Sequence, residues 1–142
     1  MILGRGVLKQ KLINYVKKND LENFIKFKNF TQNPFPHIKE ADLFILTSLY
    51  EGLPNVLLEA LVLNKFIISS NCRTGPKEIL LNGKGGDLFE IGDYKKLSKI
   101  IIKYYLNKKK SQKKVKIAKQ HLHRFNFNSN LKKYLNLVNS IS

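Results

Sequence analysis

Two short apolar runs flank an apolar helical segment in the middle of this chain, and this arrangement limits the folds open to it. Residues 43–46 have the length of a buried strand, and residues 66–69 have the length of another. Between them, residues 55–63 read as one helix. Parallel strands need a crossover connection, which is usually a helix, so a strand–helix–strand pattern favours a parallel pair. The sequence therefore predicts a βαβ unit, with 43–46 as a central parallel strand.

The same alternation of strand and helix patterns continues on both sides of this unit. Strands are expected at 1–3, as the end of a strand whose beginning is absent, at 24–27 and at 87–90. Helices are expected over 8–16, from Pro76 onward, and after Asp93 as N-cap. The predicted fold is α/β: a single Rossmann-like parallel sheet flanked by helices, spanning residues 1–106.

Residues 107–142 are predicted to form a basic helical tail. Two apolar stripes at helical spacing are interrupted by the segment 125–130. Residues 1–93 hold 12 Lys and Arg against 10 acidic residues, a net charge of +2, whereas residues 94–142 hold 14 Lys and Arg and no acid. Such a cationic segment could contact an anionic membrane surface or nucleic acid, or it could simply form a solvated face.

Other features indicate the compartment. The chain has one cysteine, Cys72, which excludes an intramolecular disulfide and fits a reducing environment. No uncharged apolar run reaches the roughly 20 residues that a membrane helix needs, and the N-terminus lacks the pattern of a signal peptide. A cytoplasmic protein is expected, with a peripheral position on the inner face of the cytoplasmic membrane as a further option.

Glu51 and Glu59 are the leading candidates for a binding site. Glu51 follows the strand 43–46, at the edge where open α/β sheets bind ligands. Glu59 lies in a helix whose other residues are apolar, so its carboxylate must reach solvent, a cation or a ligand. Vicinal hydroxyls would suit Glu59, and the helix start after Pro54 would suit a phosphate. A helix-edge role for Glu59 and a solvated loop acid at Glu51 stay open.

The turn Gly4-Arg5-Gly6 is a weaker candidate of the same kind. It follows a strand and opens a helix, but Lys9 occupies the third glycine position of the dinucleotide fingerprint. Nicotinamide chemistry is therefore not expected, and a plain strand-to-helix turn is the alternative for Gly4 and Gly6. The three histidines have no partners at metal-ligand spacing, so no metal site is expected.

Four segments together resemble a known family. They are 41–48, 50–60 with Glu51-Gly-Leu-Pro-Asn-Val-Leu-Leu-Glu59, 69–79 with Gly-Pro-Lys-Glu-Ile, and the glycine turns at 83–86 and 92–93. This series resembles the C-terminal half of retaining GT-B glycosyltransferases of group 1 (family 4), many of which build lipopolysaccharide, capsule or lipid-linked glycans. The resemblance is continuous over about residues 1–106.

The resemblance implies a nucleotide-sugar donor site without a cofactor or divalent metal. Glu59 would hold the ribose hydroxyls, Glu51 would face the donor sugar as the catalytic residue, and Phe30 and Thr31 would approach the base. The sugar and the distal phosphate would meet the backbone of Gly52, Leu53, Pro54, Asn55 and Val56. Gly4 and Gly6 are counted with these donor-binding candidates.

The implied function is transfer of a hexose, with retention, to a growing polysaccharide or lipid-linked glycan. Family members also have an N-terminal acceptor domain, and an Arg and a Lys that neutralise the diphosphate, which this sequence does not contain. The isolated chain is therefore expected to be inactive without an acceptor domain on another chain. The alternatives are a truncated, non-catalytic remnant of such an enzyme and, less favoured, a basic module that binds nucleic acid or a membrane surface.

Overall fold

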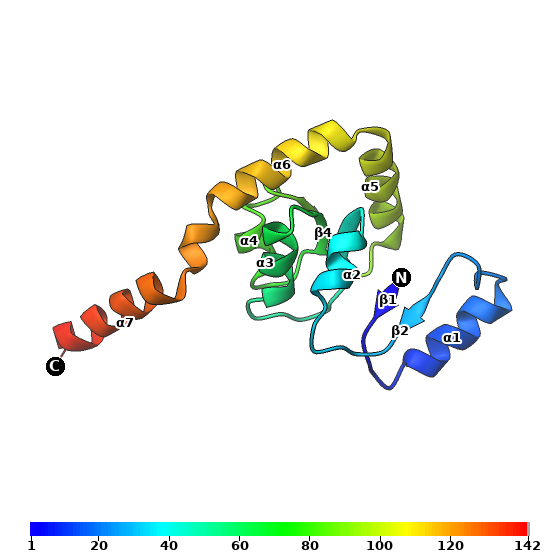
Figure 1. Ribbon diagram of the computed structural model, residues 1–142, viewed down its shortest axis with the longest axis horizontal. Helices are drawn as coiled ribbons and strands as arrows, with labels where there is room; N and C mark the ends of the chain where they lie inside the picture. The colour runs from blue at the N-terminus through cyan, green and yellow to red at the C-terminus, as the bar shows by residue number, and fades with distance from the viewer. Residues whose placement is uncertain (142) are drawn as a thin grey trace. The chain divides into compact units, whose positions relative to one another are not determined.

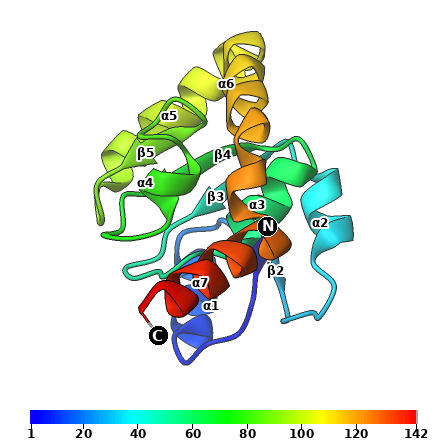
Figure 2. The same cartoon turned by 90° about the vertical axis from the view of Figure 1, so that its left-hand side faces the viewer.

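The computed structural model describes the backbone of residues 1–141 and the side chains of residues 1–140. The chain forms two compact units, one comprising Met1–Pro36 and the other beginning at His37 (Figures 1 and 2). Both are built from parallel strands and helices, which confirms the predicted α/β class. The strands fall into two ladders, one in each unit, where the sequence suggested one sheet.

The first unit is a small βαβ motif. Strand β1 (Ile2–Leu3) pairs in parallel with β2 (Phe27–Lys28), and helix α1 (Lys9–Lys18) connects them. The strand predicted over 24–27 is wrong in position, since only Phe27 of that range belongs to β2. The N–H groups of Phe24 and Ile25 donate to the carbonyl of Leu21 instead, which makes these residues part of a turn.

The second unit contains a three-stranded parallel sheet in the order β3-β4-β5. Strand β3 is Leu43–Leu46, β4 is Phe66–Ser70 and β5 is Asp87–Phe89. Every residue of β4 is buried, whereas β3 pairs only with β4 among the described residues. The central strand of this ladder is therefore β4, and the central position predicted for 43–46 is wrong.

Helices cover this sheet on both faces (Figure 2). They are α2 (Phe35–Glu40), α3 (Asn55–Val62), α4 (Pro76–Ile79) and α5 (Tyr94–Leu106). Ile67 packs with Leu57, Leu61 and other residues of α3 and α4, while Phe66 and Ile68 pack with Ile100 and Tyr104 of α5. Alternate residues of β4 thus belong to two different apolar clusters, because successive side chains of a strand point to opposite faces of the sheet. The predicted N-cap is confirmed, because Asp93 Oδ1 accepts the Lys96 N–H at 2.8 Å.

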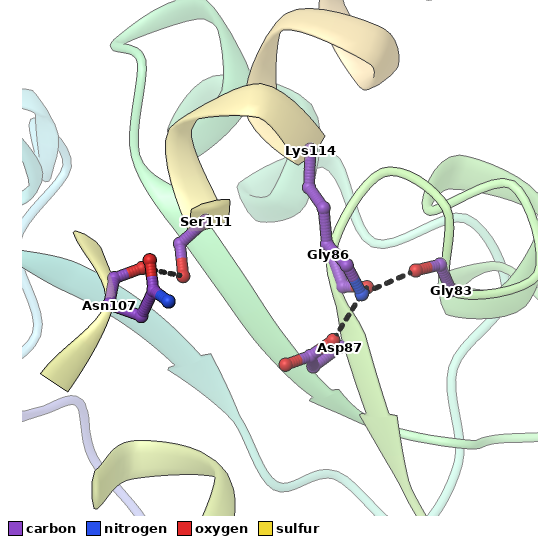
Figure 3. A network of polar contacts seen from close by, with 6 residues as sticks. All are labelled: Gly83, Gly86, Asp87, Asn107, Ser111 and Lys114. Atoms are coloured by element: carbon purple, nitrogen blue, oxygen red, sulfur yellow. Dashed lines mark hydrogen bonds and ion pairs between the residues drawn. The ribbon is translucent and has the colours of Figure 1, made fainter. Parts of the chain in front are cut away.

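Helix α6 (Lys108–Gln120) packs on the same sheet although most of its residues are polar. Its buried residues Val115 and Ala118 join the two apolar clusters. Close approach depends on Gly85, where a Cβ would lie 2.7 Å from the Ala118 Cβ. Figure 3 shows Lys114 reaching the loop before β5, where Nζ donates to the carbonyls of Gly83 (2.8 Å) and Gly86 (3.1 Å) and pairs with Asp87.

A 3₁₀ turn (Leu122–Phe125) separates α6 from α7 (Phe127–Ile141). The interruption predicted at 125–130 therefore lies earlier, because α7 already begins at Phe127. Among the described residues, no helix is long and apolar enough to cross a membrane. The domain boundary expected after residue 106 stays a prediction.

Candidate functional site

The connection from β3 to α3 holds Glu51 in a network of hydrogen bonds. Ser48 Oγ donates to Glu51 Oε1 at 2.6 Å, and the Ser48 carbonyl accepts from Ser70 Oγ at 2.7 Å and from Cys72 Sγ at 3.1 Å. Ser70 ends β4, so the network joins the carboxyl ends of two neighbouring strands. The carboxylate of Glu51, a half-buried residue, is thereby oriented by Ser48, whose backbone carbonyl is held by Ser70 at the end of β4.

The loop after β4 fixes the turn that follows Glu51. Gly75 has φ +87°, and a Cβ there would lie 2.3 Å from the Gly52 carbonyl oxygen and 2.5 Å from Pro54 Cδ. Thr74 Oγ1 also donates to the carbonyl of Glu51. Only glycine allows both this backbone conformation and this close approach. The turn at Gly52–Pro54 is therefore set by contacts to residues more than 20 positions further along the chain.

Glu59 is the polar residue of an apolar helix. Leu57, Ala60 and Leu61 around it are fully buried, whereas the Glu59 side chain is half-buried. No described residue forms a hydrogen bond or an ion pair with its carboxylate. A carboxylate at such a position retains its full capacity to accept hydrogen bonds from a ligand.

The N-terminus of α3 has free hydrogen-bond donors. Pro54 occupies the N-cap position with φ −72° and ψ 95°, and no side chain caps the helix. The Leu57 N–H donates to the Pro54 carbonyl at 2.9 Å, but the N–H groups of Asn55 and Val56 have no partner among the described residues. Beside them, a Cβ on Gly52 would meet no atom within 4 Å. These donors and the helix dipole suit an anionic group.

A second polar pair lies at the same edge of the sheet. Asn71 follows β4 and Glu90 follows β5, and Asn71 Nδ2 donates to Glu90 Oε1 at 3.0 Å. The other amide atom, Asn71 Oδ1, is buried and has no partner among the described residues. A buried acceptor without a partner is uncommon, so Asn71 adds to the unsatisfied polar groups at this edge.

The predicted site residues separate into two groups. Glu51, Glu59 and the intervening backbone of residues 52–56 lie together on the β3–α3 connection and on α3. The remaining four lie in the first unit, where Gly4 and Gly6 line a groove of about 180 Å³. There the Arg5 guanidinium lies 4.9 Å from the ring centroid of Phe30, and Thr31 Oγ1 accepts from the Asn33 N–H at 3.2 Å. Whether Gly4, Gly6, Phe30 and Thr31 share a site with Glu51 and Glu59 stays a prediction.

Sequence reasoning missed the supporting residues Ser48, Thr74 and Gly75. One signal was present, because two adjacent serines end an otherwise apolar strand, and buried hydroxyls need partners. The expectation that no metal or cofactor takes part stays a prediction.

Known proteins are similar to this chain in sequence and in fold. The family described as "Glycosyl transferases group 1" matches residues 1–121. An uncharacterized glycosyltransferase of Methanocaldococcus jannaschii is 46% identical over 80 residues, which are 56% of this chain and 20% of that protein. The N-acetylgalactosamine-N,N'-diacetylbacillosaminyl-diphospho-undecaprenol 4-alpha-N-acetylgalactosaminyltransferase of Campylobacter jejuni is 31% identical over 91 residues, 64% of this chain and 25% of that enzyme.

A solved structure has the same fold. HepE of Anabaena, crystallised in complex with UDP, superimposes with a TM-score of 0.86 at 21% identity, over 97% of this chain and 40% of HepE. HepE has also been solved in complex with UDP-glucose. The chain spans about a fifth to a quarter of the length of the two curated relatives. Because the family match covers most of its length, the chain belongs to the group 1 glycosyl transferases.

Proposed function

We propose that this chain is the donor-binding half of a glycosyltransferase that transfers a hexose, with retention, from a nucleotide sugar to a polysaccharide or lipid-linked glycan. The observation that carries the proposal is Glu59, a half-buried residue whose carboxylate has no partner among the described residues. This carboxylate accepts hydrogen bonds from the two ribose hydroxyls, since both of its oxygens are available as acceptors.

The N-terminus of α3 receives the phosphate next to the sugar. The partner-free N–H groups of Asn55 and Val56 donate to its oxygens, and the open side of Gly52 leaves room for the sugar. These dipoles stabilise the negative charge that develops on the departing diphosphate. Donor binding by HepE, whose structures contain UDP and UDP-glucose, supports this choice of ligand.

Glu51 faces the donor sugar. Its Oε1 accepts from Ser48, and this hydrogen bond leaves the other carboxylate oxygen available for a sugar hydroxyl. The role proposed for Glu51 is to orient the sugar, because catalysis here rests on positioning and on charge stabilisation. The acceptor is held by a separate domain, supplied by a longer chain or by another polypeptide. A lipid-linked acceptor is supported by the diphospho-undecaprenol in the name of the Campylobacter enzyme.

The test is saturation-transfer NMR of the purified chain with UDP, GDP, ADP and CMP, followed by titration of the nucleotide that binds. Glu59→Gln keeps the size of the side chain and removes its charge, so it should weaken binding by about 1.5–3 kcal/mol, the scale of hydrogen bonds to a charged group. Glu40→Gln is the matched control, because Glu40 is an exposed acid of α2 in the same unit.

Two results would contradict the proposal. Unchanged affinity in folded Glu59→Gln would remove Glu59 from the ribose site. If no nucleotide bound to the folded chain, a non-catalytic remnant of the family would be the better description.

A further inference from the structure

Helix α5 has two chemically different faces. Its inner face, with Ile100 and Tyr104, is buried against the sheet. The opposite face carries Lys95, Lys99, Ile102 and Leu106, which are spaced at i, i+4, i+7 and i+11 and are all exposed. Ile102 is 56% exposed and Leu106 is 77% exposed. An apolar pair thus follows two lysines along one outward stripe.

Helix α6, which follows α5 in the chain, carries more charge on its outward side. Its buried residues are Ser111, Val115 and Ala118, and Lys109 and Lys113 lie on the side of the helix away from them. Neither ammonium group has a hydrogen-bond or ion-pair partner among the described residues, unlike Lys114, which is tied to Asp87. The helices follow each other with Asn107 between them (Figure 1).

We call these outward residues of the two helices the α5–α6 face: Lys95, Lys99, Ile102, Leu106, Lys109 and Lys113. No acidic residue occurs anywhere in 94–142. The carboxylates near these helices come from earlier segments, such as Asp93 at the N-cap of α5 and Asp42 beside Lys108, and none of them forms an ion pair with a lysine of the face among the described residues. A surface of this kind attracts polyanions.

The exposed apolar residues of the face favour an anionic membrane over a nucleic acid as the polyanion. A nucleic acid would be bound through lysines and aromatic rings that stack on bases, and exposed Ile102 and Leu106 would gain little from it. Lysines surrounding exposed aliphatic side chains are typical of helices that lie in the interface of anionic membranes, where the cations meet phosphates and the apolar groups enter the acyl boundary.

We propose that the α5–α6 face docks on a membrane surface that contains anionic lipids. The lysines bind the lipid phosphates, and Ile102 and Leu106 insert below them. The proposal goes beyond donor binding and does not depend on it, since no residue of the β3–α3 connection belongs to the face.

The experiment is co-sedimentation of the full chain with phosphatidylcholine vesicles, with and without phosphatidylglycerol. Binding is expected only with phosphatidylglycerol and should weaken as salt is added. The triple variant Lys99→Gln, Lys109→Gln and Lys113→Gln should bind about a hundredfold more weakly, because each lysine near an anionic surface contributes about fivefold. The control triple is Lys11→Gln, Lys17→Gln and Lys18→Gln, which removes three exposed lysines of α1 and should bind like the wild type.

The apolar part is tested by Ile102→Ser with Leu106→Ser, against a control in which the exposed Val7 and Phe24 are changed to Ser. Weaker vesicle binding is expected only for the Ile102→Ser, Leu106→Ser pair.

Four outcomes would overturn the proposal: no binding to anionic vesicles, equal loss of binding in both lysine triples, a dimer in sedimentation velocity that the α5–α6 variants abolish, or tighter binding to a single-stranded oligonucleotide than to vesicles. Equal loss in both triples would indicate an effect of bulk charge. A dimer would identify a second copy of the chain as the partner of the face, and tighter oligonucleotide binding would identify nucleic acid.

Discussion

At the scale of single residues, Gly75 has the strictest requirement near the candidate site. Gly75→Ala would place a Cβ against the Gly52 carbonyl and Pro54, in a backbone conformation with φ +87°. We expect this substitution to lower the free energy of unfolding by about 1–3 kcal/mol and to weaken nucleotide binding, because the turn before α3 must move. Urea denaturation and nucleotide titration would measure the two effects.

Gly52→Ala is the matched control, because a Cβ at Gly52 would meet no atom within 4 Å. Its stability should stay close to that of the wild type. If Gly75→Ala unfolded at the same urea concentration as the wild type, the close packing of the two loops would not contribute to stability.

The residues of the site differ in how far the sequence reveals them. Glu59 is visible because a carboxylate among apolar neighbours stands out, and the structure gives it no partner among the described residues. Ser48 and Thr74 are not visible, since their roles depend on partners or backbone positions that only the folded chain brings together. The positive φ of Gly75 is likewise a property of the folded loop.

At the scale of elements, α5 is anchored to the sheet by Tyr104. Its ring stacks on Phe66 with centroids 5.3 Å apart, and its hydroxyl donates to the Asp42 carbonyl at 2.7 Å. Burial raises the pKa of Tyr104 above its ordinary value of 10.0, Lys108 opposes the shift, and Asp42 adds to it. The folded protein therefore keeps the phenol proton at a pH where the unfolded chain releases it.

The stability linked to this proton is complete below pH 10 and is lost as the pH rises toward the folded-state pKa. Tyr104→Phe should cost about 1 kcal/mol at neutral pH, through the lost hydrogen bond. The difference in the free energy of unfolding between the wild type and Tyr104→Phe should become smaller above pH 10. Lys108, whose pKa is raised by its hydrogen bond to Asp42, is present in both proteins. Urea denaturation at neutral and alkaline pH measures this difference, and the exposed Tyr105→Phe serves as control.

A difference that stayed constant from neutral pH to well above 10 would contradict the linkage. If Tyr105→Phe changed the free energy of unfolding with the same pH dependence as Tyr104→Phe, the effect would not be specific to the buried tyrosine.

The elements that the sequence predicts correctly are those with a strong period or a defined cap. Helix α3 and strands β3 and β4 follow from apolar runs, and the start of α5 follows from Asp93. Strand β2 was misplaced because it has two residues, which are too few to show a period. The start of α7 at Phe127 was missed because Asn and Ser residues suggested a loop, although here Asn126 Oδ1 accepts the Ser129 N–H at the start of that helix.

At the scale of the whole molecule, the two units differ in how many apolar residues they bury. Within 1–36 the only buried apolar residue is Val16, whereas the second unit contains two apolar clusters around β4. The fold class followed from the alternation of strands and helices, because that pattern is local. The division after Pro36 could not be predicted, because it depends on which elements make long-range contacts.

This difference predicts unequal local stability. In native-state hydrogen exchange, the amides of β4 should exchange slowest, and those of the β1–β2 ladder should exchange faster by orders of magnitude. The reason is that local opening costs little where few apolar groups are buried. Mass spectrometry of peptides from 1–36 and from 66–70 would compare them, and low denaturant should accelerate β4 more steeply, since its opening exposes more surface. Equal rates with equal denaturant dependence would contradict the prediction, because they would mean that both ladders open only when the whole chain unfolds.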